Sequence, residues 1–204
     1  MRTIAFLSAF TSYILFVSLV LYSAANYSGY SHVSQFISEL GASGAPTEIL
    51  FRFVGFMPTG ILLMLFSFAA IKVLPKSAMT TLGFCLLGYN AFALLAAAFF
   101  PCDFGCRPES PSVSQIVHNL LGFGGYLAAI VAIFLLGFQS RKWQGLEYLL
   151  PVGLVCGLVA VAGLLAMDPL FDLVGIAQRI LEVSIGLWTL CCAWGLRTFR
   201  TEVS

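Results

Sequence analysis

Charged residues are scarce in this sequence. Only 9% of its 204 residues are charged, ten Lys and Arg against nine Asp and Glu, whereas a soluble domain usually carries about 25%. So few charges cannot cover the surface of a water-soluble body of this size. The near-neutral balance, without a basic stripe, also excludes a nucleic-acid-binding protein.

The sequence also lacks any long segment of low hydrophobicity. Nineteen Phe residues and repeated Leu, Ala and Val runs exclude an intrinsically disordered chain. Apolar residues make up 60% of the chain, and its mean hydropathy is +0.97. These properties predict an integral membrane protein.

Six apolar stretches are long enough to cross about 30 Å of hydrocarbon, which takes about 20 helical residues. We expect spans over roughly 3–24, 49–73, 79–100, 114–138, 147–167 and 173–196. The first is expected to be a retained span, because its apolar run exceeds the about 7–15 residues of a signal peptide. The runs are continuous rather than alternating, and lipid offers no partner for free backbone groups, so the spans are predicted to be helices. The expected fold is an all-α bundle of six transmembrane helices, a single domain over 1–204.

Basic residues separate between the two ends of this six-span arrangement. Three lie at one end: Arg52, Arg107 and Arg179. Seven lie at the other: Arg2, Lys72, Lys76, Arg141, Lys142, Arg197 and Arg200. The positive-inside rule then predicts cytoplasmic N- and C-termini, so that the end with three arginines faces outward.

Polar residues gather in the outward half. The segment 25–48 is too polar to cross, and a short helix over 31–40 is expected to lie in or dip into the interface. Thr47 is a fair N-cap for the second span. Ionisable side chains within spans are costly and usually face the bundle interior in pairs. Several of these residues are therefore expected to line one polar cavity that opens outward.

Helical spacing supports this cavity. Gln115 and His118 share a face at i, i+3, and so do Arg179 and Glu182. The candidate catalytic residues are His118, Glu39 and Asp103, and the candidate ligand-binding residues are Arg52, Arg179, Glu182, Gln115, Asn119 and Ser38. The pairs Glu39–Arg52 and Arg179–Glu182 also have a purely architectural interpretation, since buried ion pairs often only fix the packing of a bundle.

Other chemistry is weakly indicated. His32, His118, Asp103 and Glu39 lack the H-x-x-x-H or H-E-x-x-H spacing of common metal sites, so neither a metal nor another cofactor is expected. No G-x-S-x-G elbow or Walker loop occurs. Cys102 and Cys106 form C-x-x-x-C on the outward side, where a disulfide would fix their loop; free thiols are the alternative.

The stretch Ser34–Gly41, followed by Gly44, Pro46 and Gly55, resembles the six-span bacterial and archaeal family catalogued as domain of unknown function 998. A second signature, Pro101-Cys-Asp103 with His118-Asn119 before a glycine-rich helix, is similar to the same family. The resemblance implies the six-span fold and a bacterial inner (plasma) membrane, but no activity.

A more distant similarity links Ser38, Glu39, Gly41 and Pro46 to the eukaryotic damage-regulated autophagy modulators (DRAM), and His118 to a histidine in their fourth span. The roles of that group and its relatives touch lysosomal membranes and the remodelling of lipid anchors. The chain has Glu39 where the DRAM pattern has Asp, and an extra loop bounded by cysteines, so function does not transfer directly.

Two classes of function remain open. In the first, the outward polar site binds a membrane lipid or small amphipathic molecule in a non-catalytic sensing or scaffold role. In the second, a membrane enzyme acts on a lipid or lipid-linked substrate at the outer leaflet, because histidine titrates near neutral pH and arginine binds oxyanions bidentately. Transport is a third option, although no internal repeat supports it.

Overall fold

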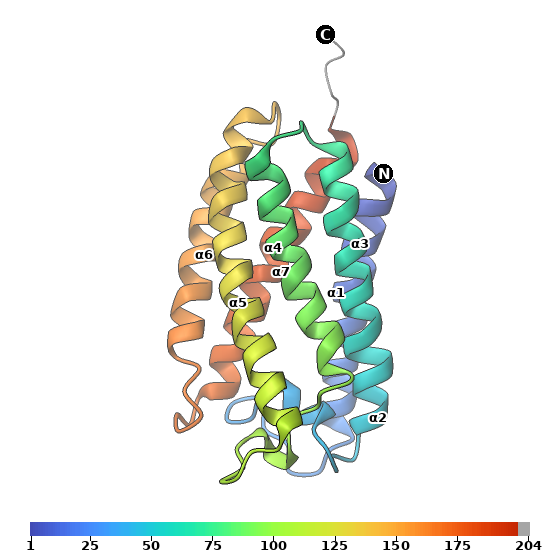
Figure 1. The fold of residues 1–204 in the computed structure, drawn as a ribbon, viewed down its shortest axis with the longest axis vertical. Helices are drawn as coiled ribbons and strands as arrows, with labels where there is room; N and C mark the ends of the chain where they lie inside the picture. Colours follow the sequence, from blue (N-terminus) through green and yellow to red (C-terminus); the bar gives the residue numbers. More distant parts are fainter. Residues whose placement is uncertain (200–204) are drawn as a thin grey trace.

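The structure, a computed structural model, describes residues 1–199 as helices joined by short loops (Figure 1). The long helices are α1 (Arg2–Ala25), α3 (Met57–Val73), α4 (Ala78–Ala97), α5 (Val113–Gln139), α6 (Leu149–Leu165) and α7 (Val174–Thr198). The short helices are η1 (Ile37–Gly41), α2 (Glu48–Leu50), η2 (Phe51–Phe56), η3 (Phe104–Cys106) and η4 (Ser140–Lys142). The prediction of an all-helical fold is confirmed for this part of the chain.

Within residues 1–199, five helical stretches are long and apolar enough to cross a membrane. They are Arg2–Ala25, Glu48–Val73, Ala78–Ala97, Val113–Lys142 and Val174–Thr198. The sixth, α6, is apolar but has only 17 residues, at the lower end of the about 17–25 that a spanning helix needs. These helices support an integral membrane protein, and the sixth span stays a prediction.

The long helices pack in chain order around a ring. Neighbours contact each other from α1 and α3 through α4, α5 and α6 to α7, and α7 returns to pack against α1. Small residues permit the closest approaches. A Cβ atom on Gly60 would lie 2.7 Å from the carbonyl oxygen of Ala91, and one on Gly163 would lie 2.9 Å from that of Ala177. Such close backbone contact is typical of helix pairs in membranes.

Figure 1 shows α1 beginning and α7 ending at the same end of the bundle. The opposite end, called the distal end below, carries the loop between α4 and α5 and the segment 26–47. The second span starts here as one continuous helix through α2, η2 and α3, with a π-helical turn at Phe51–Phe56. Pro58 follows that turn; it cannot donate a backbone hydrogen bond, and its ring would crowd the carbonyl of Val54. The wider turn relieves this clash.

The distal segment, defined as residues 26–47, closes the distal end of the ring. Its helical turn is η1, whose five residues are all buried. The expected helix over 31–40 is wrong for its first half, because Glu39 turns back to accept the Phe36 N–H and starts a separate short helix there. Thr47 is the N-cap residue of the second span as predicted, but its side chain makes no capping bond, because its hydroxyl donates to the Leu40 carbonyl of η1 at 2.7 Å.

A first prediction concerns the contact between α7 and the distal segment. A Cβ atom on Gly175 would lie 2.5 Å from the Gln35 carbonyl oxygen and 2.7 Å from that of His32. We expect Gly175→Ala to lower the free energy of unfolding by about 1–3 kcal/mol, because overpacking displaces the backbone. The measurement is the melting temperature of the purified protein in detergent.

The matched control is Gly88→Ala, whose added Cβ would meet only the Cβ of Ser67, at 3.9 Å. This substitution should leave the melting temperature unchanged or raise it, since Ala is the better helix former. Equal melting temperatures for the two variants would contradict the described contact.

Candidate functional site

Arg179 attaches the distal segment to α7. Its Nη1 group donates to the carbonyls of Gln35 at 3.1 Å and Gly175 at 2.9 Å. Its Nη2 group donates to the Tyr30 hydroxyl at 2.7 Å and to His32 Nδ1 at 2.9 Å. A guanidinium only donates, so Nδ1 of His32 is the acceptor and the proton of the neutral ring lies on Nε2. All four partners are neutral, and within residues 1–199 the charge of Arg179 has no carboxylate partner.

Glu39 stabilises the distal segment itself. The side chain is buried, and its Oε1 accepts the Phe36 N–H at 2.9 Å while Oε2 accepts from Nε2 of Gln35 at 2.7 Å. Gln35 in turn accepts the Ser31 N–H at 2.7 Å. Both carboxylate oxygens are thus occupied, and the geometry gives no support to the catalytic role predicted for Glu39.

Arg52 forms its ion pair with Glu48, one turn earlier in the same span, through Nη1 and Oε1. Its Nε also donates to the Ala98 carbonyl at 2.8 Å, and Glu48 accepts the Gly44 N–H at 2.8 Å. The pair fixes the start of the second span to the end of α4. The hypothesis of a Glu39–Arg52 pair is therefore wrong, because each partner is already satisfied elsewhere.

Asp103 organises the loop between α4 and α5. Its Oδ2 accepts the Ser112 N–H at 2.9 Å and its Oδ1 accepts the Ser112 hydroxyl at 2.7 Å. Ser112 in turn caps α5 by accepting the Gln115 N–H at 3.1 Å. The two bonds from Ser112 lower the pKa of Asp103 below its usual value. Asp103 therefore shapes this loop, and it lines none of the cavities described below.

Other predicted residues lie in this loop or at the start of α5, and hydrogen bonds and a disulfide join them. Gln115 accepts the Asp103 N–H at 2.8 Å and donates to Oδ1 of Asn119 at 2.8 Å. Cys102 and Cys106 are joined as a disulfide, with their Cα atoms 5.1 Å apart. The Cys106 sulfur lies 3.4 Å from the Ser38 hydroxyl, which brings the loop against η1.

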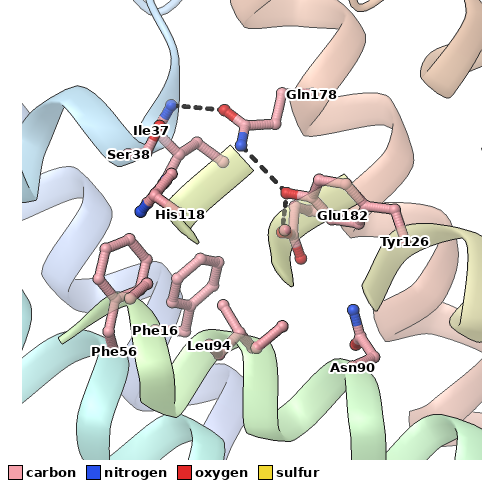
Figure 2. Close-up of a pocket in the computed structure, with 13 residues that line it drawn as sticks. Phe16, Ile37, Ser38, Phe56, Asn90, Leu94, His118, Tyr126, Gln178 and Glu182 are labelled. Atoms are coloured by element: carbon pink, nitrogen blue, oxygen red, sulfur yellow. Dashed lines mark hydrogen bonds between the residues drawn. The ribbon is translucent and has the colours of Figure 1, made fainter. Parts of the chain in front are cut away.

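A small cavity of about 50 Å³ lies beneath η1 and is called the interior cavity below (Figure 2). Its apolar lining includes Phe16 of α1 and Phe56 of η2. Its polar lining is drawn from four elements: Ser38 of η1, Asn90 of α4, His118 and Tyr126 of α5, and Gln178 and Glu182 of α7. The volume exceeds the about 10–15 Å³ that one water needs, so the interior cavity has room for a small polar group.

A directed chain of hydrogen bonds ends at Glu182 in this cavity. The Ile37 N–H donates to Oε1 of Gln178 at 2.6 Å, and Nε2 of Gln178 donates to the Tyr126 oxygen at 3.0 Å. The Tyr126 hydroxyl then donates to Oε1 of Glu182 at 2.7 Å. Across the open space in Figure 2, Asn90 rises from α4 toward Glu182. Asn90 is only 9% exposed, and its side chain makes no hydrogen bond within residues 1–199.

His118 faces the same cavity from α5. Its Nδ1 lies 2.9 Å from the Phe100 carbonyl oxygen, which can only accept, so Nδ1 carries the proton and Nε2 of the neutral ring is an acceptor. The structure therefore brings His118 together with Ser38 and Glu182, rather than with Glu39 or Asp103. The three predicted catalytic residues do not assemble.

Two larger clefts flank the interior cavity. The first, called the α1/α7 groove, has a volume of about 480 Å³ and is almost wholly apolar. Arg179 and His32 line it at the distal end, and it shares Phe16, Ile37 and Glu182 with the interior cavity. Burial and the charge of Arg179 lower the pKa of His32 below its usual value, so the imidazole is neutral at pH 7.

The second cleft, of about 250 Å³, lies between α5 and the loop from α6 to α7. It shares Ser38, His118, Gly122, Tyr126 and Gln178 with the interior cavity. Phe36, Phe123, Met167 and Pro169 supply apolar walls. The interior cavity therefore lies between a lateral apolar groove and a more polar distal cleft.

Three of the polar lining residues, Asn90, Tyr126 and Gln178, are not among the predicted site residues. A signal for one of them was present, because Asn90 is the only amide side chain in the apolar helix α4. In the part of the chain that the structure describes, no three His, Cys, Asp or Glu side chains could together hold a metal ion. Arg179 and Glu182 share a face as predicted but do not pair, since no ion pair joins them.

A comparison with protein families matches residues 11–195 to the family described as "Protein of unknown function (DUF998)". No curated protein matches the chain, and no solved structure does.

A second prediction follows from the hydrogen bonds of Asp103. A carboxylate with a lowered pKa adds stability that is fully present above its unfolded pKa, about 3.9, and is lost as the pH falls through the folded value. Asp103→Asn should therefore lower the melting temperature at pH 7, and the difference from the unsubstituted protein should shrink below about pH 4. A difference that stays constant from pH 7 to pH 3 would contradict the role of Ser112 in holding the ionised form.

Proposed function

The chain belongs to the DUF998 family of proteins of unknown function, and we propose that it is a membrane protein that binds a phospholipid in the α1/α7 groove, without catalysis. The observation that carries this proposal is that Arg179, fixed by hydrogen bonds and without a carboxylate partner in residues 1–199, lines one end of a mostly apolar lateral groove. A small amphipathic molecule with an anionic group would satisfy the same chemistry.

The apolar part of the groove suits an acyl chain but cannot by itself provide affinity. Its walls are formed by Val17, Val20, Leu21, Val183, Leu187 and Leu190. A chain that leaves the bilayer for these walls exchanges one apolar environment for another, so no hydrophobic driving force remains. Binding therefore depends on the charged end of the groove.

That end offers a preorganised site for a phosphate. Four hydrogen bonds, none of them to a carboxylate, hold the Arg179 guanidinium in place, so its positive charge remains for an anionic ligand. The neutral His32 adds a second donor through Nε2, because its Nδ1 accepts from Arg179. A charge already held in position loses little side-chain entropy when a ligand binds.

The predicted orientation would put this site in the outer leaflet. The sequence assigns seven of the ten basic residues to the end that carries the termini, and the positive-inside rule predicts that this end is cytoplasmic. In the inner (plasma) membrane of a bacterium, the groove would then accept lipid from the outer leaflet. A sensing or scaffold role fits, because Ile37 of η1 lines the groove, so a bound lipid would contact η1 directly.

An enzyme that acts on the bound lipid is the second candidate. The observation in its favour is that His118 and Glu182 line one interior cavity that shares residues with the groove. No hydrogen bond joins these two side chains, and the other predicted catalytic residues serve the loops. Binding is therefore the better supported function.

A third prediction tests the phosphate site. Phosphatidylglycerol added at about 100 times its dissociation constant should stabilise the purified protein by about 2.7 kcal/mol, and Arg179→Gln should remove most of that gain. The measurement is lipid-dependent thermal unfolding in detergent, together with lipid retention in native mass spectrometry.

The matched control is Arg107→Gln. Arg107 lies at the same end and donates to the Ser34 carbonyl at 2.8 Å, but it does not line the groove. This variant should bind lipid as the unsubstituted protein does. Equal losses of lipid-dependent stabilisation in both variants would show that the effect depends only on general surface charge. The absence of any lipid effect, in the unsubstituted protein and in both variants, would overturn the proposed function.

A further inference from the structure

We propose that the α1/α7 groove selects a phospholipid whose headgroup ends in a primary ammonium, with the phosphate at Arg179 and the ammonium at Glu182. This inference rests on the proposed function and adds the identity of the headgroup. It is carried by two opposite charges that line one groove without pairing with each other.

Glu182 lacks a cationic partner. Its Oε1 accepts the Tyr126 hydroxyl at 2.7 Å, and in residues 1–199 no Lys, Arg or His forms an ion pair with it. Glu182 is half-buried, and a carboxylate that is largely removed from water without a cation is costly, since its charge is desolvated without compensation. A bound ammonium would supply the missing charge.

Arg179 and Glu182 are three residues apart on α7, so they share a helix face, and both line the groove. The guanidinium extends toward the distal segment, whereas the carboxylate points to Tyr126, so the two charged groups are held apart. In an ethanolamine headgroup, two carbon atoms separate the phosphate ester oxygen from the nitrogen. A headgroup with its phosphate beside the guanidinium would extend along α7 to bring its nitrogen to Glu182.

The interior cavity explains why the nitrogen would be a primary ammonium. An ammonium carries three N–H donors, and the cavity that Glu182 lines also offers the side-chain amide of Asn90, with the hydroxyl of Ser38 on its other side (Figure 2). The rings of Phe16 and Phe56 add faces that attract a cation.

A trimethylammonium group fits this cavity poorly. It has no N–H to donate, and its three methyl groups would turn an apolar surface toward the polar lining of the cavity. The polar side chains of the lining would then lose their hydrogen bonds to water without gaining new ones, and leaving buried polar groups without hydrogen-bond partners costs free energy. Phosphatidylcholine should therefore bind more weakly than phosphatidylethanolamine.

The test measures dissociation constants for phosphatidylethanolamine, its N-methyl and N,N-dimethyl forms, phosphatidylcholine and phosphatidylglycerol, all with the same acyl chains. The full chain in detergent is titrated by native mass spectrometry. We expect phosphatidylethanolamine to bind about tenfold more tightly than phosphatidylcholine, with the methylated forms between them. The reason is that each methylation removes an N–H that can donate a hydrogen bond to a charged or polar group.

The diagnostic variant is Glu182→Gln, which keeps the shape and an acceptor for Tyr126. It should bring the affinities for phosphatidylethanolamine and phosphatidylcholine together while leaving that for phosphatidylglycerol unchanged. Arg179→Gln should instead weaken all the phospholipids, and Arg107→Gln none. If Glu182→Gln does not fold, the methylation series on the unsubstituted protein decides alone.

The outcomes separate the two proposals. Equal affinities across the methylation series, with a loss in Arg179→Gln, would overturn the ammonium site and leave phosphate binding in place. A preference for phosphatidylethanolamine that survives in Glu182→Gln would also overturn the assignment of Glu182. Binding that no variant affects, or no binding of any lipid, would remove the proposed function and this inference together.

Discussion

The side chain of Arg179 is the interaction on which the distal end depends. From α7 it donates hydrogen bonds to the carbonyl of Gln35, the hydroxyl of Tyr30 and the ring of His32. These bonds hold the first part of the distal segment against α7. The position of η1 follows from this attachment, together with the bond from the Ile37 N–H to Gln178. With η1 in place, the interior cavity has a lid and the α1/α7 groove has a polar end.

The surroundings explain why so many polar groups are used in this way. The distal segment is non-helical over much of its length and lies against the ends of apolar helices, so its backbone groups need partners within the protein. Glu39, Gln35 and Thr47 each satisfy such groups. Arg52 and Glu48 form an ion pair, whereas Arg179 and Glu182, like Glu39 and Asp103, have only neutral hydrogen-bond partners within residues 1–199.

The spans were predictable because length and continuous hydrophobicity are properties of local sequence. The predicted second span at 49–73 lies within the observed Glu48–Val73, and the predicted fourth at 114–138 lies within Val113–Lys142. The weakest match is α6, which at 17 residues is shorter than the predicted 147–167. The gathering of polar residues at one end also followed from the sequence alone.

The partners within the site were not predictable. The bond between Ile37 and Gln178 joins residues 141 positions apart, and that between Tyr30 and Arg179 joins residues 149 apart. Spacing along a helix indicates which residues share a face, as it did for Arg179 and Glu182, but not what a loop brings to that face. Glu39 and Asp103 were assigned to a cavity because they are acidic, whereas local hydrogen bonds with Phe36 and Ser112 decide their roles.

The most direct test of the account is an experimental structure of the protein in nanodiscs that contain phosphatidylethanolamine. The account predicts density for one ordered lipid in the α1/α7 groove, with its phosphate beside Arg179 and His32 and its nitrogen within hydrogen-bond distance of Glu182. A groove closed by contact of α1 with α7, or a lipid no better ordered there than around the rest of the bundle, would contradict it.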